Sequence, residues 1–415
     1  MQCSFLHKLL INPLEFHTQY QMRTTEKDKD FMIGFIKEVC ETIGPRRPCS
    51  VEERQCAQFL VKHLEKYCDE ARSEDFFCRP GAYRVMFHWP ILFYILALPF
   101  LFFYPLISFL VATFVIILLV GNEIYNVELI DPLFKKQKST NVIAKIRPSK
   151  EIKNIIILSG HHDSNWEFPF GKRFGTKVSI FMVLPLIFNP LLALFSILKM
   201  TMPIPLIADI ILFFIMVAPV PILIPFGMKV ISKTSVMGAN DNLSALAVCL
   251  SAARYFSDSN NKLMHSEVWI VSFGCEEIGI RGSKRFVTEH LEEIKNAYSI
   301  NLDLVGEKDC HMNVVTKEEM GAIKLSTEIG DILQNASRKV NIPITRGPVM
   351  CFTDSMAFSM KKVKSAALVG LLPDQNMPRF YHTINDTPEN VDPVVMGECL
   401  EICLQAMHDI DAKFS

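Results

Sequence analysis

Two long apolar stretches interrupt a chain whose other segments have the pattern of a water-soluble domain. Residues 85–120 contain no Lys, Arg, Asp or Glu, and the second stretch comprises residues 178–198 and 205–228, with Asp209 as its single charged side chain. About 20 apolar residues suffice for a helix to cross the hydrocarbon core of a bilayer. The second stretch therefore fits two crossings with a short turn, and the first fits one long crossing or two short ones.

The remaining segments alternate between helix-like and strand-like patterns. Apolar residues at helical spacing predict helices within residues 29–70, broken at Gly44-Pro45, and Ser50 with Glu53 has the spacing of a capping box. A buried helix is predicted between Asp241 and Phe256. Short apolar runs predict strands at 141–146, 154–158, 267–272, 297–302 and 365–369. This alternation is typical of a layered α/β domain with a largely parallel central sheet.

Five side chains of metal-binding types are spread along this pattern. Most follow an apolar run, which places them at strand ends or in the next loop, where open α/β sheets carry their chemistry. Two imidazoles and three carboxylates suit a pair of zinc-like ions that share one carboxylate. Such a pair indicates metal-assisted attack of water on a carbonyl group. The five residues are His161, Asp241, Glu277, Asp303 and His382.

The order of these residues predicts that each apolar stretch returns to the side of the membrane from which it starts. His161 precedes the second stretch and Asp241 follows it, so a shared site requires that this stretch comes back to the side it left. The helices before residue 80 should pack with the strand at 141–146, which requires the same of the first stretch. We therefore predict four membrane-embedded helices in two inserted transmembrane hairpins. The alternative is that both stretches are core helices of a larger soluble protein.

Charge and cysteine content bear on partners and location. The formal net charge of -1 gives no indication of nucleic-acid binding. The twelve cysteines lack a tight CxxC pair and residues 1–16 make a poor secretory signal, so we expect reduced thiols rather than a disulfide framework. Positive charge stays cytoplasmic, which predicts a cytoplasmic catalytic domain, with a lumenal or external one as the alternative. The flanking cations on that side are Arg79, Arg84, Lys135, Lys136, Lys138, Lys172, Arg173, Lys177, Lys229 and Lys233.

Neighbouring residues indicate roles within the site. Residues i and i+2 of a strand share a face, so Asp163 can accept a hydrogen bond from the His161 ring, while His162 points away. Glu276 and Glu277 are adjacent acids after an apolar strand, and their repulsion calls for a nearby cation. The economical assignment makes Glu277 a ligand and Glu276 the general base, which moves a proton from water to the leaving amine.

Each of these residues also has a plainer interpretation when taken alone. Asp241 could cap the following helix, although a helix start is also a good place for a shared ligand. The His-x-Asp pair could be a satisfied polar contact and the two glutamates could lie on an exposed helix. Asp303 could be a turn acid and His382 a surface histidine. If His382 is a ligand, Asp386 could orient it and Tyr381 could donate to a developing oxyanion.

In sequence order, His-x-Asp, Asn-Asp-Asn, Glu-Glu, Leu-Asp and Tyr-His resemble the M28 family of zinc aminopeptidases. The resemblance covers about residues 31–80, 125–172 and 232–412, and includes Gly44-Pro45-Arg46 and the run at 353–358. It implies a mixed, mainly parallel sheet flanked by helices, two Zn²⁺ per chain and release of an N-terminal residue from a peptide. The implied roles are one zinc on His161 and Asp303, the other on Glu277 and His382, a bridging Asp241, Glu276 as general base and Asp163 supporting a ligand.

The inserted hairpins are not part of the minimal fold of this family. We expect a peptidase domain at 1–84, 121–176 and 231–415, with membrane hairpins at 85–120 and 177–230. The second hairpin opens between the first two ligands, which favours access along the membrane surface and a short hydrophobic peptide as substrate. Peptide and membrane lipid are the expected partners, and the sequence leaves the oligomeric state open.

Two other functions fit the same residues. Leu302-Asp303-Leu304-Val305-Gly306 also resembles glutaminyl cyclases, which are acyltransferases with a similar fold that keep one zinc. Some relatives have lost their ligands and serve as receptors or membrane scaffolds. Here all five positions and Glu276 are present, which favours a two-zinc exopeptidase.

Overall fold

An eight-stranded sheet forms the centre of the protein, with strand order β1-β2-β4-β3-β5-β10-β6-β9. The computed structural model describes residues 23–86, 88–125, 127–174, 178–318, 321–349, 352–373 and 377–415. The strands are β1 (Glu70–Cys78), β2 (Gln137–Ile146), β3 (Asn154–His161), β4 (Ser266–Phe273), β5 (Tyr298–Asp303), β6 (His311–Val315), β9 (Thr345–Gly347) and β10 (Lys364–Leu371). A separate small ladder pairs β7 (Lys317–Glu318) with β8 (Ile323–Lys324).

The centre of the sheet is parallel and its sides are mixed. β3 pairs in parallel with β4 and β5, and β5 with β10, whereas β2 runs antiparallel to both β1 and β4. The predicted mixed, mainly parallel sheet is therefore confirmed, and all five predicted strands are present. Strand β1, which is mostly polar over Glu70–Asp75 as suits an edge strand, and the short strands β6 to β9 were not predicted.

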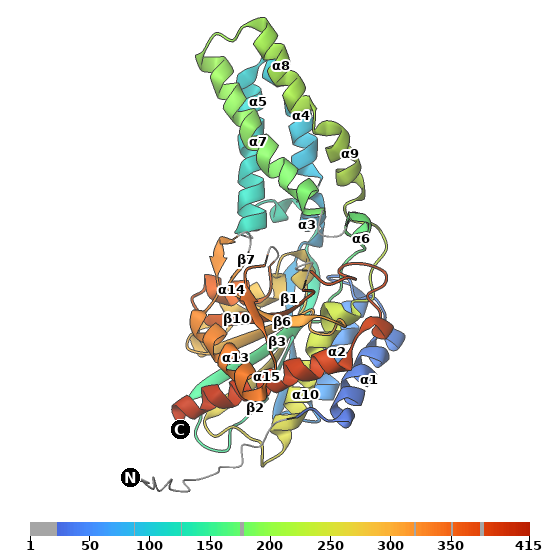
Figure 1. Cartoon of the computed structure of the whole chain (residues 1–415), viewed down its shortest axis with the longest axis vertical. Helices are drawn as coiled ribbons and strands as arrows, with labels where there is room; N and C mark the ends of the chain where they lie inside the picture. Colours follow the sequence, from blue (N-terminus) through green and yellow to red (C-terminus); the bar gives the residue numbers. More distant parts are fainter. Residues whose placement is uncertain are drawn as a thin grey trace, which may run out of the picture.

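Helices cover both faces of this sheet (Figure 1). One face packs in a large apolar cluster with α1 (Glu26–Thr42), α2 (Val51–Leu64), α10 (Ser244–Ser257), α13 (Thr327–Val340) and α15 (Pro393–Asp411). The other face packs against α11 (Arg281–Glu289), α12 (Leu291–Ile294) and α14 (Ser355–Met360). Buried apolar residues on both sides of the sheet thus hold its strand ends in fixed positions.

Two local predictions need correction and a third is confirmed. The helical region predicted to reach residue 70 ends with α2 at Leu64, because β1 begins at Glu70. Ser50 does cap α2 by accepting from the Glu53 N–H, but the Glu53 side chain accepts from the Cys49 N–H instead of closing a capping box. The predicted buried helix is confirmed as α10, which begins at Ser244, with Asp241 just before it in the short segment η4 (Ala239–Leu243).

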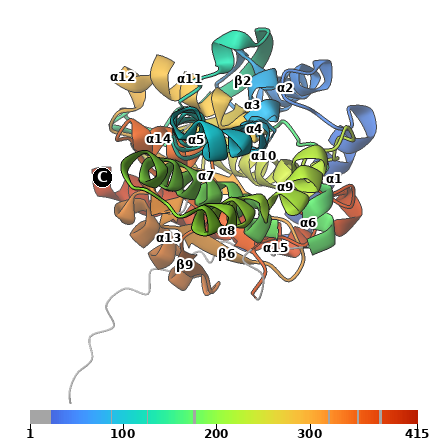
Figure 2. The same cartoon turned by 90° about the horizontal axis from the view of Figure 1, so that it is seen from above.

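A bundle of apolar helices projects from one end of the α/β domain (Figures 1 and 2). It contains α3 (Pro80–Met86), α4 (Trp89–Phe103), α5 (Pro105–Leu118), α7 (Val178–Thr201), α8 (Leu206–Val217) and α9 (Val220–Lys229), with α6 (Pro169–Phe174) at its base. Val183–Thr201 and Leu206–Lys229 are long and apolar enough to cross a membrane. The bent pair α3–α4 would make a third span if its two helices are taken as one segment. The apolar helix Pro105–Gly121 is shorter than these spans.

The bundle has its own core and an apolar outer surface. Tyr94, Leu101 and Met216 are buried inside it, whereas Ile207 and Phe214 are 75% and 65% exposed. Lys199 and Asp209 form an ion pair of 2.6 Å across the turn between α7 and α8. An exposed apolar surface of this extent indicates a lipid or protein environment rather than water.

Both insertions leave the domain from the same edge of the sheet. β1 is parallel to β4, because both are antiparallel to β2, so β1 and β3 end at the same edge as β4. The first insertion follows β1 and the second follows β3.

Two sequence predictions involve residues outside the described ranges. The prediction about a secretory signal concerns residues 1–16, and the flanking positive charges include Lys177; residues 1–22 and Lys177 lie outside the described residues.

Candidate metal centre

The carboxyl ends of the parallel strands bring the five predicted residues together. His161 is the last residue of β3 and Asp303 the last of β5, and these strands are neighbours. Glu277 lies in the turn η5 (Glu276–Ile278) after β4, Asp241 lies in η4, and His382 lies in the loop after β10. All five side chains are buried or nearly so.

The five residues form two groups that share Asp241. One group contains His161, Asp241 and Asp303, and the other contains Asp241, Glu277 and His382. His161 Nε2 lies 3.3 Å from Asp241 Oδ1 and 3.7 Å from Asp303 Oδ1. His382 Nε2 lies 3.1 Å from both Asp241 Oδ2 and Glu277 Oε2. The two oxygens of Asp241 therefore face different imidazoles.

The chemistry of these groups fits a pair of divalent cations. Asp241 Oδ2, Glu277 Oε1 and Asp303 Oδ1 are buried and accept no hydrogen bond from any described residue. Burial, together with nearby Asp241, raises the pKa of Glu277 to about 7, and burial raises the pKa of Glu276 well above its usual range. Buried carboxylates without donors are costly unless a cation pairs with them. Two imidazoles and three carboxylates are a donor set that zinc accepts.

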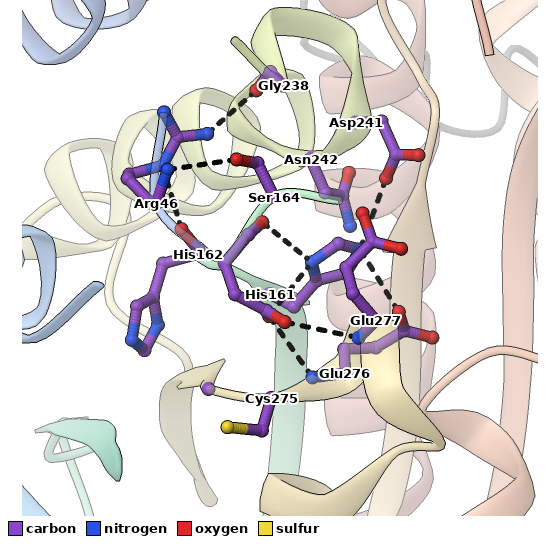
Figure 3. Close-up of polar contacts among 12 residues, drawn as sticks. Arg46, His161, His162, Ser164, Gly238, Asp241, Asn242, Cys275, Glu276 and Glu277 are labelled. Carbon is purple, nitrogen blue, oxygen red and sulfur yellow. Dashed lines mark hydrogen bonds and ion pairs between the residues drawn. The ribbon is translucent and has the colours of Figure 1, made fainter. Parts of the chain in front are cut away.

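Asp163 contacts both the turn that carries Glu276 and Glu277 and the ring of His161. Its Oδ1 and Oδ2 accept from the backbone N–H groups of Glu276 and Glu277, each at 3.1 Å. Its Oδ1 also lies 3.3 Å from His161 Nδ1, the ring nitrogen opposite the one that faces Asp241. The expected contact between Asp163 and the His161 ring is thus present. His162 points away from the site and its Nδ1 lies 2.8 Å from Ser272 Oγ (Figure 3).

The loop around His382 differs from expectation in one respect. Asp386 does not orient His382; its oxygens accept from the backbone N–H groups of Asn240 at 2.6 Å and Asp241 at 3.1 Å. Asp386 therefore holds the shared carboxylate in place through the backbone of η4. The Tyr381 ring stacks on His382 with centroids 3.7 Å apart. The oxyanion role of Tyr381 stays a prediction.

Asn165 is a site residue that sequence reasoning missed. Its Nδ2 lies 2.6 Å from Glu277 Oε2 and 3.1 Å from His382 Nε2. It directly follows the Gly160–Ser164 segment, which is the one signal that would have singled it out. Its amide joins two residues of the second group to the chain segment that leads into the bundle.

Arg46 ties together the loops that carry the site. It is fully buried, and its guanidinium donates to the carbonyls of Gly44, His162, Met237 and Gly238 at 2.8–2.9 Å (Figure 3). Gly238 has φ +65°, and a Cβ there would lie 2.4 Å from the Asp241 carbonyl oxygen. The turn before Asp241 therefore needs both this glycine and this arginine.

The comparisons with known proteins agree with this geometry. Residues 224–407 match the family model Peptidase family M28. This part of the chain is therefore similar to the M28 peptidases. The aminopeptidase YwaD of Bacillus subtilis (strain 168) is 26% identical over 186 residues, which is 42% of this chain and 38% of that protein. The match thus spans well under half the length of that relative.

Solved structures show the same fold. The zinc aminopeptidase BSAP from Bacillus subtilis superposes with a TM-score of 0.56 and 15% identity, covering 92% of this chain and 95% of that one. The aminopeptidase from Aneurinibacillus sp. strain AM-1 gives 0.56 and 16%, with 94% and 95% covered. A glutaminyl cyclase from Bacteroides thetaiotaomicron gives 0.54 and 15%, with 92% and 97% covered. The zinc-aminopeptidase-like fold expected from the sequence is therefore confirmed.

We predict that Arg46→Lys lowers the free energy of unfolding by about 3 kcal/mol. A lysine keeps the charge but not the planar fork, so at least two buried carbonyls lose their donor, at about 1–3 kcal/mol each. Unfolding of the purified protein in detergent measures this loss. Arg47→Lys is the matched control, because Arg47 is the exposed neighbour of Arg46. Equal stability of the two variants would contradict the role given to Arg46.

Proposed function

We propose that this protein is a membrane-anchored two-zinc aminopeptidase. The observation that carries the proposal is the position of Asp241, whose two oxygens face His161 and His382 at 3.3 and 3.1 Å. A carboxylate that faces two separate ligand groups suits two ions about 3.5–4 Å apart, the usual spacing of two-metal sites. The M28 match and the aminopeptidase relative support the same reaction class.

The proposed ligands are those expected from the sequence. His161 and Asp303 would hold one zinc, Glu277 and His382 the other, and Asp241 both. Bound zinc would supply Lewis-acid chemistry, activating a water molecule and polarising the scissile carbonyl. The remaining work falls to side chains that position the ligands or move protons.

Glu276 is the proton carrier in this proposal. Its Oε2 lies 3.7 Å from His161 Nε2, and its backbone is fixed by the hydrogen bond to Asp163. From this position its carboxylate takes a proton from the attacking water and passes it to the leaving amine. Asp163 contributes by holding Glu276, Glu277 and the His161 ring in one arrangement.

The bundle is the proposed membrane anchor, formed by the insertions at 85–120 and 177–230. Its exposed apolar surface and two span-length helices support a multi-pass integral membrane protein. Basic residues at its domain side, such as Arg79, Arg84 and Lys172, support a cytoplasmic catalytic domain. The Phe168 N–H, at the base of the second insertion, donates to the His382 carbonyl at 2.9 Å. The metal centre thus lies next to the bundle, which favours short hydrophobic peptides as substrates.

We predict that Glu276→Gln lowers peptidase turnover about 10²–10⁴-fold without loss of zinc, because the amide can neither accept nor return the proton. A peptide-library digest by detergent-purified protein measures turnover, and elemental analysis measures zinc. Glu292→Gln serves as the control, since that side chain is exposed. Undiminished hydrolysis by the Glu276→Gln variant would exclude Glu276 as the base, and a wild-type protein without hydrolysis would favour a non-catalytic scaffold.

Metal removal gives a second expected outcome. A chelator should abolish hydrolysis and added zinc should restore it. His161→Ala and His382→Ala should each bind one zinc fewer than the wild type, because each removes a ligand from a different group. The double variant His161→Ala/His382→Ala should lose both zinc ions. If it lost only one ion, and the wild-type protein cyclised N-terminal glutamine instead of releasing it, the protein would be a glutaminyl-cyclase-like enzyme. That outcome matters because cyclases share this fold.

The proposed orientation can be tested by glycosylation. An acceptor sequence with a flexible spacer, inserted after Met202 in the turn between α7 and α8, should be glycosylated in microsomes. The native acceptors Asn335-Ala336-Ser337 and Asn385-Asp386-Thr387, whose asparagines are exposed, should stay unmodified. The reverse pattern would place the M28 domain on the lumenal side.

A further inference from the structure

Three cysteine thiols converge next to the candidate metal centre. Cys49 precedes α2, Cys78 ends β1, and Cys275 lies in the turn after β4. Their Sγ atoms are 3.1 Å (Cys49–Cys78), 3.4 Å (Cys49–Cys275) and 3.5 Å (Cys78–Cys275) apart. All three side chains are buried. Because they come from three distant segments, no spacing in the sequence reveals the cluster.

The arrangement has the geometry of a thiolate metal site. Three sulfurs at nearly equal separations can face one point, whereas a disulfide joins two of them and leaves the third aside. A tetrahedral zinc ion with bonds of about 2.3 Å holds its sulfurs about 3.8 Å apart. The sulfurs would have to separate by about 0.3–0.7 Å from their present 3.1–3.5 Å to reach this spacing. Thiolates are the ligands that select zinc over harder divalent ions.

Glu53 gives a second, independent reason for a cation at this place. It is fully buried, and among the described residues its oxygens accept from neutral groups. Those donors are the backbone N–H groups of Cys49 and Cys275 at 2.9 Å, the Ser139 hydroxyl at 2.9 Å and the Cys275 thiol at 3.2 Å. A buried carboxylate of this kind is costly unless a cation is near. Glu53 Oε1, at 3.2 Å from the Cys275 Sγ, lies beside one of the three sulfurs.

We propose that Cys49, Cys78 and Cys275 bind a structural zinc ion, distinct from the two zinc ions of the proposed catalytic site. Binding would release the thiol protons to solvent and form three zinc–sulfur bonds, with no change of oxidation state. The ion would join the start of α2, the end of β1 and the turn after β4. Cys275 directly precedes Glu276 (Figure 3), so the ion would also fix the turn that carries Glu276 and Glu277.

X-ray absorption at the zinc edge tests the proposal on the full chain, purified with reductant and without chelator. The wild-type spectrum should contain a sulfur shell at about 2.3 Å in addition to the nitrogen and oxygen shells at about 2.0–2.2 Å. Cys78→Ala should lose the sulfur shell. Cys56→Ala, which removes an equally buried thiol outside the cluster, should keep it.

Two further measurements separate this site from the proposed catalytic one. His161→Ala should keep the sulfur shell while losing one of the two zinc ions bound by nitrogen and oxygen, so failure of the peptidase proposal leaves this test intact. A wild-type spectrum with nitrogen and oxygen shells alone would overturn the proposal. Mass spectrometry after alkylation under non-reducing conditions would also overturn it if two of the three cysteines were joined in a disulfide.

Discussion

The guanidinium group of Arg46 satisfies carbonyl groups from segments that are far apart in the chain. The His162 carbonyl belongs to the segment with His161 and Asp163, and the Met237 and Gly238 carbonyls belong to the turn before Asp241. A buried guanidinium is stable only where acceptors match its N–H donors. The segment with Arg46, the segment with His161 and the turn before Asp241 therefore stabilise one another. The backbone N–H of Arg46 also donates to Ser164 Oγ at 2.9 Å. This network sets the separation between the first ligand and the shared carboxylate.

The direction of the strands places the site and the bundle at one edge of the sheet. Parallel strands end on the same side, and β1, β3, β4 and β5 all end there. Side chains at those ends meet because the sheet is held from both faces by apolar clusters. The same edge supplies the exits of both insertions. Under the proposed topology, the metal centre therefore faces the membrane surface, because the site and both insertions share this edge of the sheet.

The sequence predicted those features that follow from local patterns. Five strands, the buried helix after Asp241 and the five converging residues all depend on periodicity or on residue type at strand ends. The roles of residues whose partners are distant in the sequence were not predicted. Arg46 has its partners near residues 162 and 238, and Glu53 has the spacing of a capping residue but accepts hydrogen bonds from Ser139 and Cys275. Local rules contain no information about such partners.

The second insertion lies between two ligands yet leaves their separation unaffected, because its two ends pair with each other. The Val236 N–H donates to the Asn165 carbonyl at 3.0 Å, the Glu167 N–H donates to the Thr234 carbonyl at 2.8 Å, and the Ser232 N–H donates to the Glu167 carbonyl at 3.0 Å.

This backbone pairing closes the insertion at its base before the helices begin. The distance from His161 to Asp241 then depends on the closed base and on Arg46, and not on the length of α7 to α9. Asn165 stands on the domain side of this closure, with its amide on Glu277 and His382. A displacement of the bundle can therefore reach the metal centre through this short paired segment.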